Sequence, residues 1–115
     1  MKNQLILFLL VFGFSYLAEA QIIKTSLTLT VRDELGNTVE GVEVKLFENE
    51  ADYVSEKNYS AEGITDKKGI IKFKDIKAVG YFVIARKGDK DNAGGGEQIA
   101  KLEPNKFNKA TLVIQ

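Results

Sequence analysis

The sequence predicts an all-β protein, a β-sandwich of roughly six or seven short strands. In several segments apolar residues alternate with polar ones, which is the period of a strand with one buried face. Clusters of Gly, Asn and Asp separate these segments at intervals of roughly eight to twelve residues. No segment shows a long helical period, so a parallel α/β sheet is not expected. A small closed barrel is the structural alternative.

The first twenty residues have the pattern of a signal peptide. Lys2 supplies the positive start, Leu5–Phe14 is an apolar run of ten residues, and Ala18 and Ala20 form an A-x-A cleavage site. Ten residues are too few to cross a hydrocarbon core, which needs about 20. We therefore expect residues 1–20 to be removed by a cut after Ala20, residues 21–115 to form a secreted or periplasmic domain, and no membrane span after cleavage.

The first two strands of the expected domain are predicted to form a hairpin. In Thr25–Arg32 the apolar residues are Leu27, Leu29 and Val31, and the alternation resumes in Val39–Phe47. Residues 33–37, D-E-L-G-N, have the composition of a turn. Gly41, inside the second strand, indicates a bulge.

The middle of the chain begins with a polar connection. Glu48–Gly63 breaks the alternation, and we expect it to cross between the sheets with a helical turn near Glu50–Glu56. Thr65–Gly69, T-D-K-K-G, predicts a turn before a strand at Ile70–Asp75. Tyr81–Arg86 is almost continuously apolar, which is typical of a central strand covered on both faces, with Tyr81 in the core.

The last third of the chain is predicted to hold a loop and two strands. Lys87–Glu97 is long, polar and rich in Gly, and we expect a flexible tip. Gln98–Leu102 is predicted to be a short strand and Ala110–Gln115 the final one. The final strand, with residues 111–114 (T-L-V-I), is the one most able to pair edge to edge with a partner.

Composition and charge exclude several classes of function. The chain contains no His, Cys or Trp, so Ser-His-Asp and Cys-His mechanisms are impossible, and zinc would find only carboxylate ligands. Cleavage would remove Lys2 and Glu19 from the 16 basic and 16 acidic residues, leaving a neutral domain. Nucleic acid and acidic membrane surfaces are not expected as partners, because neither would find a basic surplus. We expect no enzymatic activity and no cofactor.

Candidate binding residues lie where the alternation lapses. Tyr53 and Tyr59, on the polar connection, have aromatic rings that can stack on a sugar. Asp89, Asp91 and Asn92 offer oxygen atoms at close spacing in the Gly-rich loop, as in a calcium loop. The full calcium-loop pattern fails, because Ala93 and Ala100 fall where ligands are needed. We therefore predict no defined metal-ligand set, and a looser calcium site remains an alternative.

Three stretches of the chain are similar to carboxypeptidase regulatory-like domains, which are transthyretin-like (prealbumin-like) modules. The shared features are a D-x-x-G turn before a G-x-x-V strand, a T-D-x-x-G turn before a Phe-containing strand, and a G-Y pair opening the next strand. Here they fall on Asp33, Gly36, Gly41, Val44, Thr65, Asp66, Gly69, Phe73, Gly80 and Tyr81. The resemblance implies a seven-stranded Greek-key sandwich with an accessory role.

The chain also resembles, more distantly, collagen-adhesin B-type repeats, in which a lysine bonds to an asparagine. That chemistry requires a lysine on an inward position, whereas the alternation places Lys45 and Lys72 outward. We therefore do not expect such a bond.

Taken together, the residues predict a non-enzymatic module that contacts another envelope or extracellular protein in a structural or interaction role. A carbohydrate- or calcium-binding module is the alternative, and a hydrolase ranks third because the chain has so few nucleophiles and bases.

Overall fold

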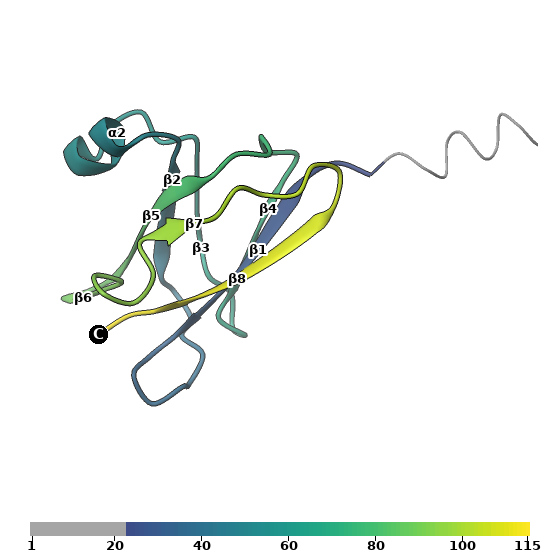
Figure 1. The fold of residues 1–115 in the computed structure, drawn as a ribbon. Coiled ribbons are helices and arrows are strands. Elements are labelled where there is room, and N and C mark those ends of the chain that lie inside the picture. Colours follow the sequence, from purple (N-terminus) through teal and green to yellow (C-terminus); the bar gives the residue numbers. More distant parts are fainter. Residues whose placement is uncertain (1–22) are drawn as a thin grey trace, which may run out of the picture.

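The computed structural model describes residues 23–115, so the predicted signal peptide and its cleavage site lie outside the described residues. The chain folds as a nearly all-β sandwich of two sheets, as predicted (Figure 1). The first sheet has the order β4-β1-β8, and the second has the order β3-β2-β5-β6, with β7 also paired to β5. The strands are β1 (Ser26–Arg32), β2 (Glu43–Phe47), β3 (Ala61–Ile64), β4 (Ile70–Lys74), β5 (Tyr81–Lys87), β6 (Lys90–Asp91), β7 (Gln98–Ile99) and β8 (Phe107–Val113), and the helix is α2 (Glu50–Ser55).

The predicted opening hairpin is wrong, because β1 and β2 belong to different sheets. β1 pairs antiparallel with β4 and parallel with β8, whereas β2 pairs with β3 and β5. Between them only an isolated bridge, Arg32 to Thr38, joins the two arms. Alternation shows that each strand has one buried face, but it does not show which sheet contains the strand. Gly41, with φ +78°, lies just before β2. This strand begins at Glu43, four residues after the predicted start at Val39.

The prediction that the connection Glu48–Gly63 crosses between the sheets is wrong. The connection joins β2 to β3, which are antiparallel neighbours in the second sheet. The predicted helical turn is confirmed as α2, whose first turn is capped by the Asn49 side chain accepting a hydrogen bond from Asp52 N at 2.9 Å. The crossing is made instead by the turn Thr65–Gly69, which leads from β3 to β4 in the other sheet.

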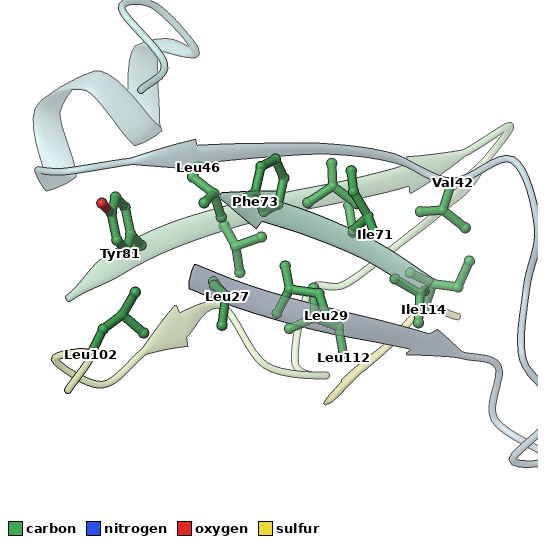
Figure 2. Close-up of a cluster of buried hydrophobic side chains, with 14 residues drawn as sticks. Leu27, Leu29, Val42, Leu46, Ile71, Phe73, Tyr81, Leu102, Leu112 and Ile114 are labelled. Carbon is green, nitrogen blue, oxygen red and sulfur yellow. The ribbon is translucent and has the colours of Figure 1, made fainter. Parts of the chain in front are cut away.

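The core lies between the two sheets (Figure 2). β1, the central strand of the first sheet, contributes Leu27, Leu29 and Val31, all with 0% exposure. Tyr81 is also buried, as predicted, and its hydroxyl donates to Lys77 O at 2.8 Å. The remaining core residues are Val42, Val44, Leu46, Ile71, Phe73, Val83, Ala85, Leu102, Leu112 and Ile114.

A second, smaller apolar cluster lies on the outer face of the second sheet, under α2. Tyr53 of α2 stacks on Phe82 with ring centroids 5.3 Å apart and meets Phe47 edge-on at 6.1 Å. Phe47 is fully buried yet lies outside the main core. β5 is therefore apolar on both faces because the core covers one face and α2 partly covers the other.

The Gly-rich loop is held against the end of the chain, which corrects the prediction of a flexible tip. Val113 N donates to Gly95 O at 2.9 Å, and Asp91 and Gln115 exchange two backbone hydrogen bonds. A Cβ atom on Gly95 would overlap the Val113 carbonyl oxygen, so only glycine fits there. The last strand begins at Phe107, three residues earlier than predicted. Among residues 23–115 there is no helix long and apolar enough to cross a membrane.

Thr65 fixes the point where the chain leaves β3, and its replacement tests this crossing. Its buried hydroxyl accepts from Val42 N at 2.9 Å and donates to Val39 O at 2.7 Å. Thr65→Ala leaves both backbone groups without this partner, so we expect the free energy of unfolding to fall by about 2 kcal/mol. Urea denaturation measures the change. Thr65→Ser, which keeps the hydroxyl, should lose less than half as much, and equal losses would contradict this role of the hydroxyl.

Candidate functional site

The two segments predicted to carry function meet at one hollow on the outer face of the second sheet. The hollow has a volume of about 220 Å³. α2 and the residue after it form one side, and the segment after β5 forms the other. Its lining residues are Tyr53, Val54, Glu56, Ile84, Arg86, Asp91, Asn92, Ala93 and Glu97. Three of the five residues predicted from the sequence, Tyr53, Asp91 and Asn92, are thus brought together.

Tyr53 forms an aromatic wall of this hollow. One face of its ring stacks on Phe82, so that face is not available to a ligand. Burial, together with the nearby Glu97 carboxylate, raises the pKa of the Tyr53 phenol above its ordinary value of 10.0. The phenol therefore stays protonated and able to donate a hydrogen bond throughout the neutral range.

An ion pair between Arg86 and Glu56 crosses the hollow. Arg86 Nη1 and Nη2 donate to the two carboxylate oxygens of Glu56 at 2.6 and 2.9 Å, a bidentate geometry. Glu56 is the C-cap of α2 and has the left-handed conformation, with φ +55°. The chain then continues toward β3. The hydrogen bonds from Arg86 lower the pKa of Glu56 and raise that of Arg86.

The three predicted residues of the Gly-rich loop have different surroundings. The Asn92 side chain is buried, and its amide oxygen accepts from Ala85 N at 3.0 Å while its amide nitrogen donates to Val83 O and Gly96 O at 2.9 Å each. These bonds engage the amide fully within the fold.

The two aspartates are more accessible. Asp91 Oδ1 accepts from Ala93 N at 2.9 Å, and the residue lines the hollow. Asp89 is exposed and does not line it. Within the described part of the chain no group of three or more His, Cys, Asp or Glu side chains is arranged to hold a metal ion.

Tyr59, the remaining predicted residue, lies apart from the hollow. Its hydroxyl donates to Glu62 Oε1 at 3.0 Å, and the Lys45 ammonium lies 5.4 Å from its ring centroid. Lys72 makes a similar contact with Phe107 at 5.3 Å. Both lysines are thus directed to the surface, as the alternation predicted.

Glu56, Arg86 and Glu97 were not identified as site residues from the sequence. Glu56 and Arg86 are 30 residues apart, and neither belongs to a motif. Their only sequence signal was position, since each flanks or lies within a segment where alternation ends. Chemically the hollow combines three carboxylates, one guanidinium and a phenol over an apolar floor. That set can bind polar or cationic groups, but it presents no nucleophile paired with a base.

Comparison with known proteins identifies the architecture. No protein-family model matches the sequence, and no curated protein sequence matches it. Similar solved structures include the streptococcal ancillary pilin (18% identity, TM-score 0.58, 81% of this chain and 32% of that chain). Another is the TIE protein of Bacillus anthracis (18% identity, TM-score 0.56, 80% of this chain and 17% of that chain). A third is BcpA, the major pilin subunit of Bacillus cereus (20% identity, TM-score 0.52, 81% of this chain and 30% of that chain).

These matches show a common fold. The chain spans about a third or less of the length of each of these proteins, so it is similar to one part of them. At identities of 18 to 20% the similarity establishes the β-sandwich architecture and leaves function to be argued from this chain's own surface.

The hydrogen bonds of Asn92 predict a structural role that can be measured. Asn92→Ala removes the partner of two backbone groups of β5 and of one in the loop, so we expect the free energy of unfolding to fall by about 3 kcal/mol. Asp89→Ala, an exposed change in the same loop, should alter it by less than about 0.5 kcal/mol. Thermal and urea unfolding give both values, and a stable Asn92 variant would show that the loop does not depend on this side chain.

The ion pair across the hollow predicts a pH dependence of stability. Because Arg86 lowers the pKa of Glu56 below its ordinary value of 4.5, the folded state favours the ionised carboxylate. This stabilisation is complete above pH 4.5 and is lost as the pH falls through the lowered pKa. The difference in unfolding free energy between the wild type and Glu56→Gln should therefore shrink as the solution is acidified. Glu34→Gln, in an exposed turn, is the control, and a difference independent of pH would contradict the assignment.

Proposed function

We propose that the chain is a non-enzymatic structural module of the cell envelope or cell surface that acts by binding another protein. The observation that carries this proposal is an uncovered strand edge on β8. An ancillary pilin and a major pilin subunit contain a domain of this fold, which supports a structural role. The predicted signal peptide agrees with export.

The hydrogen bonds at the two ends of β8 define which of its residues face β1. Ser26 N donates to Lys106 O at 3.1 Å, and Ile114 N donates to Arg32 O at 2.9 Å. Successive residues of a strand direct their N–H and C=O groups to alternate sides. The backbone N–H and C=O groups of the even-numbered residues of β8 therefore point toward β1. Those of the odd-numbered residues point outward, along the open edge of the sheet.

Only one end of this outward edge is covered. Val113 N is bonded to Gly95 O, so the Gly-rich loop covers the C-terminal end of this edge. The sequence-based prediction had placed the pairing edge at residues 111–114, and this bond removes Val113 from it. Among residues 23–115, no loop or turn accepts from or donates to the other outward backbone groups. We call these groups the free edge, and they belong to Phe107, Lys109 and Thr111.

A groove lies beside the free edge and gives an added strand a place for its side chains. It has a volume of about 320 Å³ and separates β8 from the segment 98–102. Leu27, Leu102 and Leu112 form its apolar floor, and Lys101 and Lys109 line it too. An extended segment of a partner could hydrogen-bond to the free edge and place alternate side chains in this groove, which is strand addition.

A second candidate function uses the hollow around Tyr53. Because the hollow brings Tyr53 and Asp91 together, we propose it as the site of the alternative, a ligand-binding module, with carbohydrate as the ligand class. Calcium is not favoured there, since the described residues contain no group of three acidic side chains arranged to hold a metal ion. The turns at Asp33–Gly36 and Asp66–Gly69 are formed as the resemblance to carboxypeptidase regulatory-like domains implies, and we propose kinship with that family on this basis.

Photocrosslinking in cells that produce the full chain tests the principal proposal. Lys109, which lies on the free edge, is replaced by the photoreactive residue benzoylphenylalanine. We expect illumination to give a covalent protein adduct in the envelope or extracellular fraction, because the partner strand would lie within contact distance of this side chain.

The same replacement at Lys67, which is exposed in the turn Thr65–Gly69, is the matched control. Adduct yield should be at least several-fold higher at position 109. Equal yields at the two positions, or no adduct at either, would contradict a protein-binding role for this edge.

A further inference from the structure

The outer strand of the second sheet has a free edge that complements that of β8. β3 is the end strand of its sheet. Thr65 N donates to Val42 O at 3.0 Å, so Thr65 faces β2, and by alternation Gly63 does too. Glu62 and Ile64 therefore direct their backbone groups away from the sheet. Among the described residues, no loop or turn bonds to these outward groups.

The side chains on the two edges match in an antiparallel register. If Lys109 lies opposite Glu62, then Phe107 lies opposite Ile64. The first pair joins opposite charges and the second joins an aromatic to a β-branched residue, both of which are favourable cross-strand pairs. Phe107 and Ile64 are 67% and 62% exposed, unusually high values for such residues, and each would be covered by the other.

The hydrogen-bond pattern is compatible with the same register. Lys109 and Phe107 present free N–H and C=O groups on β8, and Glu62 and Ile64 present them on β3. Opposed residues with free groups on facing edges form the closely bonded pairs of an antiparallel ladder. Both pairs therefore satisfy their backbone groups at once, with no shift of register.

The inward side chains of β3 are small, which suits the groove beside β8. In this register Ala61 lies opposite Ala110, and Gly63 lies opposite Asn108. Ala110 and Asn108 line the groove of about 320 Å³. Alanine and glycine add little bulk of their own on this face, where Ile71 of the same copy already packs against Gly63.

Other edges of the molecule fit β8 less well. β4, the opposite edge of the first sheet, carries Lys72 and Lys74 on its outer face, and β8 itself carries Lys109. Pairing β8 with either strand of a second copy would place like charges together, a common device against edge-to-edge association. Of the outer strands in residues 23–115, only β3 carries an acidic residue and no basic one.

We infer that β8 of one copy pairs antiparallel with β3 of a second copy of this chain, through Lys109–Glu62 and Phe107–Ile64. This inference rests on the proposed function, because it names the partner of the free edge. The contact joins two different strands, so each copy keeps one unused edge. Such a heterologous contact can repeat, and it builds either a closed ring or an open filament according to the rotation between copies.

A charge exchange tests the pairing on the chain from Gln21 onward, which contains the whole described sandwich. Sedimentation velocity should show concentration-dependent self-association of the wild type. Lys109→Glu and Glu62→Lys should each weaken association about tenfold, because each replaces an attractive pair by a repulsive one. An equal mixture of the two variants, or the double variant, should restore association, since Lys and Glu again face each other. Lys90→Glu, on β6, should leave it unchanged.

A disulfide test reports the same contact independently. The chain contains no Cys, so the double variant Lys109→Cys, Glu62→Cys carries only the two introduced thiols. Oxidation should give a ladder of oligomers on a non-reducing gel. The control pair Lys90→Cys, Glu62→Cys should give none. Circular dichroism confirms that each variant is folded.

The outcomes separate the inference from the proposed function. A wild type that stays monomeric at about 1 mM, together with no ladder, overturns the β8–β3 pairing. If the photoreactive residue at position 109 still gives an adduct with a different protein, the proposed function stands without the self-association. Loss of both the ladder and every adduct removes both.

Discussion

The structure depends on the burial of β1 at the centre of the first sheet. Its inward side chains, Leu27, Leu29 and Val31, are completely buried, and each contributes roughly 1.5–3 kcal/mol through the removal of apolar surface from water. β4 and β8 satisfy the backbone of β1 on its two sides, and the second sheet covers its inner face. A chain without disulfides can fold around this strand because both the core and the ladder converge on it.

The need to cover this core from two sides explains the route of the chain. β1 and β2 do not pair as neighbours but lie in different sheets, and their apolar faces meet across the core. The turn that begins at Thr65 returns the chain to the first sheet. The buried hydroxyl of Thr65 satisfies two backbone groups at this crossing. The remaining loops lie at the periphery, where α2 and the segment after β5 converge on the hollow around Tyr53 and Arg86.

The same architecture leaves backbone groups exposed at the edges of the sheets. An open sandwich has end strands with unsatisfied backbone groups, and this protein covers some of them and leaves others. The Gly-rich loop covers the C-terminal end of β8 through Gly95, whereas Phe107, Lys109 and Thr111 remain uncovered. Glu62 on β3 carries the charge opposite to that of Lys109 on β8, whereas Lys72 and Lys74 on β4 carry the same charge as Lys109.

The sequence by itself determined the fold class, most strand positions, a helical turn near Glu50–Glu56, the burial of Tyr81 and the outward direction of Lys45 and Lys72. These follow from local periodicity, which reports whether a residue faces a core. Only the tertiary structure decided that β1 and β2 lie in different sheets, that Asn92 supports β5, and that Glu56 meets Arg86. The physical reason is that alternation is the same whichever sheet a strand joins, while hydrogen bonds and ion pairs between residues far apart in sequence exist only after the sheets have closed on their core.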